Sequence, residues 1–364
     1  DVTMLPIVKV SIPSKEILMK ELENVLYSGM IAEGEVVYRF EEEFAEHFGL
    51  PFALAMSSGT AALHAALVHC GVAGGEVVTT SMTAEPTNVA ILQAGGIPVF
   101  ADVDPSSGNL DPLSIEQKIT SKTKAIMVVH YAGIPARMKE IREVADKFNI
   151  PIIEDCAHAL GALYAGEGIG NVGDFAIYSL QAIKHMTTVD GGILVCKNQD
   201  LIPNLKKFRW FGLQKGVPRT EVDITSIGYK YNMNNVAATI GLTQLKTIRE
   251  RVINLHIQNG KFFDDEISKI SGLSVATFDE FSEPSYWLYT ILSDDSEHVE
   301  RLLASIQVSA SKLHRPNHLH SIFKPFTNGL PQLDNYYKRM IHIPCGWWVT
   351  PEIREQIVET LKKG

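Results

Sequence analysis

Residues 175–196 read Phe-Ala-Ile-Tyr-Ser-Leu-Gln-Ala-Ile-Lys-His-Met-Thr-Thr-Val-Asp-Gly-Gly-Ile-Leu-Val-Cys. An apolar run typical of a strand leads into a polar turn with one lysine, Lys184, and Gly191-Gly192 opens a second apolar run. A lysine fixed between two buried strands can lose its proton, and the neutral amine is a nucleophile toward aldehydes. Taken alone, the residue is more simply an exposed loop lysine. Its meaning therefore depends on the segments upstream.

Strand-like and helix-like segments alternate upstream of this stretch. Strands are predicted at residues 52–56, 76–80, 97–101, 124–130 and 150–154, and helices at residues 60–70, 85–94 and 136–148. Such alternation is typical of a mostly parallel sheet with helices on both faces. The runs 125–129 and 150–153 are apolar throughout, as expected of strands that are buried on both sides. The sequence therefore predicts an α/β fold.

Amphipathic helices are predicted on both sides of the α/β region. Two precede it, between Pro13 and Gly29 and over residues 37–48. A long helical pattern follows it from about residue 234 to 270, and residues 351–362 form a closing helix after short mixed elements. We interpret residues 1–233 as a large domain with N-terminal helices. Residues 234–364 are then a bridging helix and a small α+β C-terminal domain.

Composition excludes several classes of protein. The 364 residues are 45% hydrophobic and 21% charged, as in soluble globular proteins, and no apolar run is long enough for a bilayer. The net charge of -9, with no basic cluster, argues against nucleic acid as a partner. No secretion signal is visible, so a cytoplasmic protein with reduced cysteines is expected. The cysteines are Cys70, Cys156, Cys196 and Cys345. Neither their spacing nor that of the histidines predicts a metal site.

A candidate phosphate site lies at Ser57-Ser58-Gly59-Thr60, where a predicted strand ends and a helix begins. Helix N-termini present unpaired N–H groups and the positive end of the helix dipole, and they bind phosphate. Gly59 lets a ligand approach the backbone, and the hydroxyls of Ser58 and Thr60 add donors. An ordinary serine N-cap also explains these residues. The segment matches neither a dinucleotide fingerprint nor a P-loop.

Asp155 lies just past the predicted end of a buried strand, where open α/β sheets bind ligands. A carboxylate there can pair with a protonated pyridine nitrogen and make the ring an electron sink. His158 lies three residues further on and can face the same ligand. Alternatively, Asp155 is a helix N-cap and His158 is a surface histidine. Pyridoxal 5'-phosphate (PLP) has a phosphate, a ring nitrogen and an aldehyde. The candidate phosphate site, Asp155 and Lys184 would each bind one of these groups, in that order.

The chain resembles the DegT/StrS family of PLP-dependent nucleotide-sugar aminotransferases over nearly its whole length. The resemblance rests on four motifs, at residues 57–64, 154–158, 179–184 and 228–234. It implies the type I aminotransferase fold and a homodimer with shared active sites. Two positions depart from the family. Ala84 stands where an aromatic residue commonly covers the cofactor ring, and Val189 replaces the first glycine of a Gly-Glu/Asp-Gly-Gly motif.

The resemblance also implies roles for individual residues. Lys184 would bind the PLP aldehyde covalently, with pyridoxamine 5'-phosphate as the aminated intermediate. Gly59, Thr60 and Ser179 would hold the phosphate. Asp155 would pair with the ring nitrogen, and His158 would contact the oxygen side of the ring. Asn232 would reach the phosphate of the cofactor in the partner subunit, or it is simply a turn residue before the long helix. Candidates for binding the substrate's diphosphate are Arg209, Lys230, Lys312, His314, Arg315 and His318. Each of these six is equally explained as a solvated surface charge.

The implied reaction is a ping-pong transfer of an amino group from an amino acid, expected to be L-glutamate, to a nucleotide-linked 4-keto-6-deoxyhexose. Residues 179–185, 209–212 and 343–348 are similar to that branch. A 3-keto-sugar aminotransferase and a non-catalytic PLP-binding regulator remain open. A sugar dehydratase of the family would carry histidine in place of Lys184, and a nicotinamide-dependent oxidoreductase would need a glycine fingerprint after the first strand. No motif specifies the nucleotide, the sugar stereochemistry or the donor.

Overall fold

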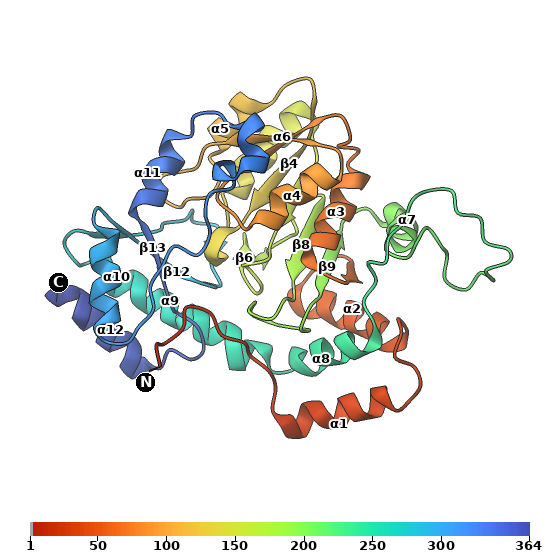
Figure 1. Ribbon diagram of the computed structural model, residues 1–364, viewed down its shortest axis with the longest axis horizontal. Helices are drawn as coiled ribbons and strands as arrows, with labels where there is room; N and C mark the ends of the chain where they lie inside the picture. Colours follow the sequence, from red (N-terminus) through yellow and green to blue (C-terminus); the bar gives the residue numbers. More distant parts are fainter. Residues whose placement is uncertain (1–2) are drawn as a thin grey trace.

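A seven-stranded sheet forms the centre of the molecule in the computed structural model, which describes residues 3–364 (Figure 1). The strand order is β1-β9-β8-β5-β4-β2-β3. Neighbouring strands are parallel except where β9 pairs with β1 and with β8. The strands are β1 (Ala53–Met56), β2 (Glu76–Thr80), β3 (Ile97–Ala101), β4 (Thr123–Val129), β5 (Ile152–Asp155), β8 (Phe175–Ser179) and β9 (Gly192–Cys196). The predicted mostly parallel sheet is confirmed.

The predicted strand bounds hold to within two residues, and β2 and β3 match them fully. The largest shift is in β5, which was expected to begin at Ile150 and begins at Ile152. Pro151 cannot donate a hydrogen bond to a sheet ladder, so the regular strand starts after it. The ladder continues to Asp155, which pairs with Val129 and with Ile177. Asp155 is therefore the last residue of the strand, and the prediction that it lies just beyond the strand is wrong by one residue.

Helices cover both faces of this sheet because alternate side chains of each strand point to opposite sides. The cluster containing Leu54 and Met56 packs against α3 (Gly59–His69), α4 (Glu85–Gln93) and α7 (Ile202–Phe208). The cluster containing Ala53 and Ala55 packs against α2 (Glu35–Phe48), α5 (Pro112–Lys118), α6 (Met138–Phe148) and α8 (Asn235–Leu245). α3 and α4 both begin close to the carboxyl ends of parallel strands, which determines where a ligand site can form.

The long helical pattern after residue 234 is present but is not one regular helix. α8 is followed by a π-helical turn, Arg249–Ile253, and then by α9 (Asn254–Ile267). A π turn inserts an extra residue and rotates the face of the helix that follows it. Asn234 begins the element because its side-chain oxygen accepts the Ala237 N–H at 2.8 Å.

A smaller unit packs beside the large sheet (Figure 1). Its antiparallel sheet has the order β10-β12-β13, and a third sheet has the order β11-β6-β7. The smaller unit comprises β10 (Leu273–Val275), β12 (Tyr289–Ser293), β13 (Met340–Ile343), α10 (Ser296–Ala304), α11 (Pro331–Arg339) and α12 (Pro351–Lys363). The third sheet consists of β6 (Leu163–Tyr164), β7 (Glu167–Gly168) and β11 (Ser282–Glu283), and its Tyr164 packs in the core of the large sheet. Leu5 bridges to Val308, so the N-terminal segment also lies on this unit. The domain boundary at residues 233 and 234 stays a prediction.

Two parts of the chain lie at the periphery. α1 (Lys15–Leu26) runs along the outside of α8, and the segment between α7 and α8 projects from the body as a long arm (Figure 1). Both carry exposed apolar side chains, which include Ile17, Leu26, Tyr27, Phe211, Ile224 and Ile227. No helix within residues 3–364 is both long and apolar enough to cross a bilayer.

Candidate active site

A pocket of about 370 Å³ opens at the carboxyl ends of the parallel strands. Its lining residues come from the starts of α3 and α4, the ends of β5 and β8, and the loop between β8 and β9. They are Ser58, Gly59, Thr60, Leu63, Ala84, Glu85, Pro86, Thr87, Asp155, Ala157, Ile177, Ser179, Gln181, Lys184, Asp190 and Gly191. The fold thus brings together five residues that the sequence singled out: Gly59, Thr60, Asp155, Ser179 and Lys184.

One end of the pocket is the N-terminus of α3. Ser58 is the N-cap, and its hydroxyl accepts the Ala61 N–H at 3.0 Å, so this hydroxyl serves the helix first. A Cβ atom on Gly59 would stand 3.2 Å from the Ser179 Cβ, tighter than ordinary packing. The helix therefore starts directly against the end of β8. The first-turn N–H groups and the Thr60 and Ser179 hydroxyls form a cradle that fits an anion such as phosphate.

Lys184 reaches the pocket from the 12-residue loop, residues 180–191, that joins β8 to the antiparallel β9. Burial lowers the pKa of the Lys184 amine to about 8, although the nearby carboxylate of Asp155 opposes this shift. The Nζ atom also lies 4.1 Å from the centre of the Trp287 ring. A substantial fraction of this amine is neutral near pH 8, and the neutral form is the nucleophile.

This lowered pKa gives a direct prediction for the protein without cofactor. The labelling of Lys184 by an amine-reactive reagent is expected to rise with pH around a midpoint near 8, because only the neutral amine reacts. The labelled peptide is quantified by mass spectrometry across a pH series. A labelling midpoint of about 10.4, the pKa of an ordinary lysine, would show that the pocket does not disfavour the ammonium form.

Asp155 is buried beside the pocket, at 4% exposure. Its Oδ2 atom accepts the Thr87 hydroxyl at 2.8 Å, and its Oδ1 atom accepts the Ala157 N–H at 3.1 Å. Burial raises the pKa of this carboxyl, while these two donors and the charge of Lys184 lower it. Thr87 in turn lies 2.9 Å from the Thr83 hydroxyl. Because Thr87 donates to Asp155, its oxygen is free to accept from Thr83, and the two hydroxyls form a directed chain toward the carboxylate.

His158 is not among the pocket-lining residues. Its Nδ1 atom accepts the Ala132 N–H at 3.1 Å, and its ring packs on Trp287 with the ring centres 4.1 Å apart. Burial, reinforced by the charge of Lys184, holds its pKa well below the ordinary value. The histidine is therefore neutral near pH 7 and forms part of the wall behind Lys184.

Asn232 lies outside the pocket of its own chain, close to the phosphate end. It forms an isolated bridge with Met56, and the neighbouring Tyr231 carbonyl accepts the Ser57 N–H at 2.6 Å. The Asn232 Oδ1 atom is buried and has no hydrogen-bond partner among residues 3–364.

Two of the expected substrate ligands have internal partners instead. Arg209 is 2% exposed, and its guanidinium contacts Glu41 at 2.7 Å and the Ala55 carbonyl at 3.0 Å. The Lys312 ammonium donates to carbonyls at the end of α11, among them Met340 at 2.5 Å. Both side chains therefore use their charge in contacts between segments of the fold. Lys230, by contrast, is exposed at the base of the arm, where its backbone forms an isolated β-bridge with Trp210.

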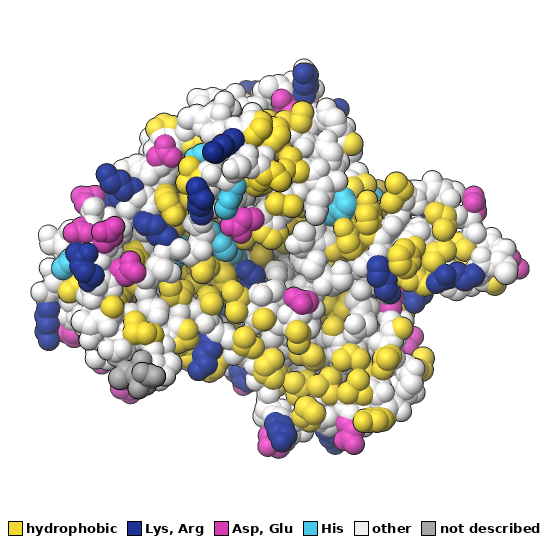
Figure 2. Space-filling view, in the orientation of Figure 1, with side chains coloured by type: hydrophobic (Ala, Val, Ile, Leu, Met, Phe, Trp, Pro, Cys, Tyr) yellow, Lys and Arg dark blue, Asp and Glu magenta, His cyan; other side chains and the backbone are white. Residues whose placement is uncertain are grey.

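The other candidates belong to a loop, residues 311–320, that is anchored to the segment before α4. His318 Nδ1 lies 2.6 Å from the Ser81 hydroxyl, and the Asn317 side chain donates to the Thr83 carbonyl at 2.8 Å. The His314 ring is parallel to that of His158, with the centres 5.8 Å apart, and burial lowers its pKa to about 4. Arg315 is exposed. In Figure 2, histidine and acidic side chains gather beside α4 on this face of the molecule.

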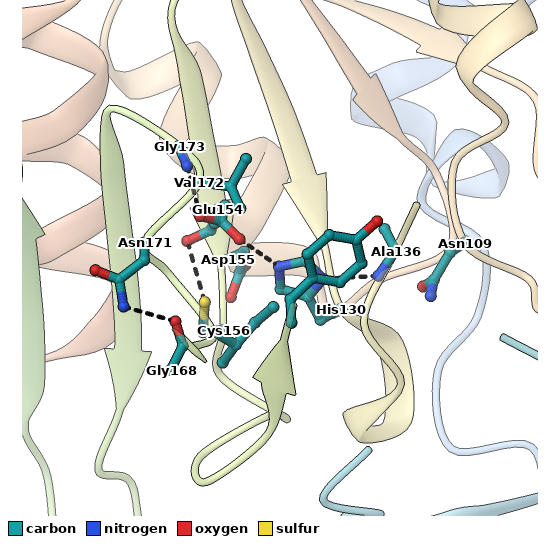
Figure 3. A network of polar contacts seen from close by, with 12 residues as sticks. Asn109, His130, Ala136, Glu154, Asp155, Cys156, Gly168, Asn171, Val172 and Gly173 are labelled. Carbon is teal, nitrogen blue, oxygen red and sulfur yellow. Dashed lines mark hydrogen bonds and ion pairs between the residues drawn. The ribbon is translucent and has the colours of Figure 1, made fainter. Parts of the chain in front are cut away.

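A buried cluster on the opposite face of the sheet resembles a metal site in geometry. Ligand atoms of His130, Glu154 and Cys156 lie within 4.8 Å of one another (Figure 3). However, His130 Nε2 lies 2.9 Å from Glu154 and its Nδ1 accepts the Ala136 N–H at 2.9 Å. The second Glu154 oxygen accepts the Gly173 N–H at 2.7 Å. With both imidazole nitrogens engaged, we interpret the cluster as a structural network that joins β4 to β5.

The family model described as the DegT/DnrJ/EryC1/StrS aminotransferase family matches residues 14–362. The chain belongs to this family. It is 34% identical over 346 residues to UDP-4-amino-4,6-dideoxy-N-acetyl-beta-L-altrosamine transaminase from Campylobacter jejuni, covering 90% of this chain and 88% of that protein. The crystal structure of the sugar aminotransferase CalS13 from Micromonospora echinospora superposes with a TM-score of 0.95 at 34% identity, over 99% of this chain and 100% of that one.

A further solved structure bears on the cofactor. The putative sugar aminotransferase Spr1654 from Streptococcus pneumoniae has been solved in a PLP form and a PMP form, with TM-scores of 0.89 and 0.90. It is 25% identical and covers 99% of this chain, which covers 98% of that protein in the PLP form and 97% in the PMP form. The present chain is thus a PLP-dependent aminotransferase with the type I fold. The family and cofactor implied by the sequence motifs are confirmed.

Two features of this DegT-family site need the structure to be seen. Thr87 lines the pocket and donates to Asp155, but only its spacing of four residues from Thr83, about one helical turn, hints at this in the sequence. Trp287 contacts Lys184 across 103 positions of sequence, with no motif to mark it. Ala84, which the sequence singled out, lines the pocket, and no aromatic side chain of the described residues lines it. The position of Ala84 relative to the cofactor ring stays a prediction.

Proposed function

We propose that this enzyme transfers the amino group of an amino acid, L-glutamate, to the keto carbon of a nucleotide-linked 4-keto-6-deoxyhexose. One observation carries the proposal. The Lys184 amine, the Asp155 carboxylate and the α3 N-terminus line one pocket of about 370 Å³. These groups match the aldehyde, the ring nitrogen and the phosphate of PLP in turn. The residues present therefore fit the cofactor.

Each residue then has a defined task. The N–H groups at Gly59 and Thr60 and the Ser179 hydroxyl would hold the phosphate. Asp155, with Thr87 behind it, would keep a proton on the ring nitrogen. Lys184 would hold the aldehyde end of the cofactor, and its amine would take and return a proton at the donor's α-carbon. When bound, PLP supplies the electron sink that makes this α-proton removable.

The substrate class is supported by the relatives. The Campylobacter jejuni relative is named for a UDP-linked 4-amino-4,6-dideoxy sugar, and CalS13 is named a sugar aminotransferase. The loop that carries His314, Arg315 and His318 stands beside α4, whose first residues line the pocket. We assign sugar and diphosphate contacts to this loop and to Lys230 rather than to Arg209 and Lys312, which have internal partners.

A homodimer with shared active sites completes the proposal. α1 and the arm between α7 and α8 expose apolar side chains that a second copy would cover. Figure 2 shows apolar side chains over both regions. Asn232 lies near the phosphate end of its own chain, at a bridge with Met56. The Nδ2 group of its amide is the donor that would reach the phosphate in the partner subunit, since the amide oxygen only accepts. The four cysteines are free thiols, which suits action in a reducing compartment such as the cytoplasm.

The test begins with the absorbance spectrum of the PLP-loaded protein before and after L-glutamate. Conversion to the spectrum of the aminated cofactor is expected, followed by its reversal on addition of one keto sugar from a panel. The panel combines dTDP, UDP and GDP with 4-keto-6-deoxy and 3-keto hexoses. Reversal only by a 3-keto sugar would move the reaction to that carbon. A cofactor band that ignores every amino acid and keto sugar would instead indicate a non-catalytic PLP-binding regulator.

Replacing Thr87 with valine is expected to lower kcat about 10-fold to 100-fold while the fold is kept. Valine has nearly the shape of threonine but cannot donate to Asp155, and a hydrogen bond to a charged group contributes about 1.5–3 kcal/mol. The loss raises the pKa of Asp155, so the acid limb of the pH profile should move to higher pH. Thr87→Ser keeps the hydroxyl and should restore most activity. Equal losses in both variants would contradict the role given to this hydroxyl.

A further inference from the structure

The smaller unit holds the backbone on both sides of Lys184. The Trp287 indole N–H donates to the carbonyl of Ile183 at 3.0 Å. The His185 ring donates from Nε2 to the carbonyl of Ser285 at 3.0 Å. The residues immediately before and after the lysine are thus tied to two positions of one short segment, residues 285–288, which leads into β12. These two hydrogen bonds limit the movement of the backbone at Lys184.

The same segment also contacts the amine. The Trp287 ring centre lies 4.1 Å from Lys184 Nζ, and the side chain is 2% exposed. At this distance the face of an aromatic ring attracts an ammonium group. The ring is supported by His158, whose centre is 4.1 Å away at an interplanar angle of 35°. Trp287 therefore has one fixed position from which to act on the lysine.

Segment 285–288 is wedged against the turn at residues 131–133. The Ser285 N–H donates to the Gly133 carbonyl at 3.0 Å, and the Leu288 N–H donates to the Ala132 carbonyl at 3.3 Å. Gly133 has a φ of +94°, and a Cβ atom there would stand 2.7 Å from the backbone nitrogen of Trp287. Only glycine fits so close an approach. Trp287 is thus placed by main-chain bonds that do not involve the cofactor pocket.

We propose that Trp287 is a positioning residue for Lys184, with its indole N–H fixing the adjacent backbone and its ring face holding the amine in the pocket. The proposal rests on the proposed role of Lys184 as the amine that binds the cofactor. The titratable groups around this amine are Asp155, His158, His185 and His314, and Glu85 and Asp190 line the same pocket. Burial keeps the three histidines neutral, so the carboxylates, Asp155 first among them, and the Trp287 ring favour the ammonium form.

The test uses the cofactor-free protein and follows two properties of Lys184. The first is the pH midpoint of its labelling by an amine-reactive reagent. The second is the rate at which added PLP becomes attached to it, measured by borohydride trapping. Trp287→Met keeps the site apolar but has neither an aromatic face nor a donor, whereas Trp287→Phe keeps a ring and loses only the donor. Trp347→Met is the matched control, because Trp347 faces Lys9 at 5.1 Å and does not line the pocket.

We expect Trp287→Met to lower the labelling midpoint by about half a unit to one unit, since the lost ring contact stabilised the charged form. Attachment of PLP should slow by roughly 10-fold or more, because a misplaced nucleophile can lose about 100-fold in rate. Trp287→Phe should keep a midpoint close to the wild-type one yet still show slower attachment. The control should match the wild type in both measurements.

Unchanged midpoint and rate in Trp287→Met would overturn the proposal, and so would an equal change in Trp347→Met. If Trp287→Met does not fold, the attachment rate in Trp287→Phe decides the matter alone. The labelling midpoint does not depend on the cofactor. A wild-type protein whose Lys184 labels as described but never attaches PLP would therefore refute the proposed function while leaving the ring contact established.

Discussion

Replacing Lys184 with alanine is expected to reduce the transamination rate by at least ~10³-fold while PLP still binds. Among the described residues no other lysine lines the pocket, so no second amine can take over either the covalent bond or the proton transfer. A positioned acid–base group alone contributes about 10²–10⁴-fold, and the loss of the covalent bond adds to this. Binding persists because the phosphate cradle and Asp155 are unchanged. Single-turnover absorbance measurements with L-glutamate, beside equilibrium PLP binding, give both quantities.

Lys197→Ala is the matched control for this experiment. Lys197 lies just after the end of β9 and is exposed, with its ammonium 3.4 Å from the Val172 carbonyl. The substitution removes the same side chain outside the pocket, and wild-type turnover is expected. Borohydride should fix PLP covalently to the wild type and to Lys197→Ala but not to Lys184→Ala. Full turnover in Lys184→Ala would refute the assignment of the catalytic amine.

Asp155→Asn is expected to lower kcat by about 10²–10⁴-fold, the second large effect. Asparagine is close in shape but carries no charge, so it cannot keep a proton on the ring nitrogen. Removing one partner of a buried charge pair costs about 3–5 kcal/mol, which corresponds to that loss in rate. The melting temperature of the cofactor-free protein should change little, because burial already disfavours the Asp155 carboxylate, as its raised pKa shows. Steady-state kinetics of the PLP-loaded protein and thermal melts of the cofactor-free protein test the two statements.

The neighbouring carboxylate provides a control with the opposite expectation. Glu154 points to the other face of the sheet, where it contacts His130 and the Gly173 N–H (Figure 3). Glu154→Gln should lower the free energy of unfolding by about 1–3 kcal/mol, since a buried partner loses its acceptor. Turnover per folded molecule should stay near that of the wild type. If Glu154→Gln instead abolished turnover in a stable protein, the division of roles between the two carboxylates would be wrong.

The parallel core was predictable because its apolar runs are short, bounded and separated by helical patterns. Gly59, Asp155 and Lys184 could be placed together since each follows a predicted strand, and the carboxyl ends of parallel strands meet at one edge. The direction of β9 was not predicted, because an apolar run of five residues does not encode the strand beside which it lies. Strand pairing is decided by tertiary packing.

Side-chain partners were harder to foresee than positions. Arg209 suggested an anion site by its charge, but sequence does not reveal that Glu41 from α2 would meet it inside the protein. Lys312 is a similar case, since carbonyls at the end of α11 surround its ammonium. Thr87 and Trp287 went unnoticed because their importance comes only from contacts with Asp155 and Lys184. Contacts between distant segments carry no local pattern.

The pairing of β1 with β9 has a consequence for the order in which the enzyme assembles. β1 lies at the edge of the large sheet, and its one neighbour there is β9, which follows it by about 140 residues. During synthesis on the ribosome, β1 has no strand to join until Cys196 has emerged. Nascent chains that stop before Gly192 therefore leave an unpaired edge next to the start of α3, a template for aggregation. The anion cradle at the start of α3 is translated long before β9 but is completed only after β9 has paired with β1.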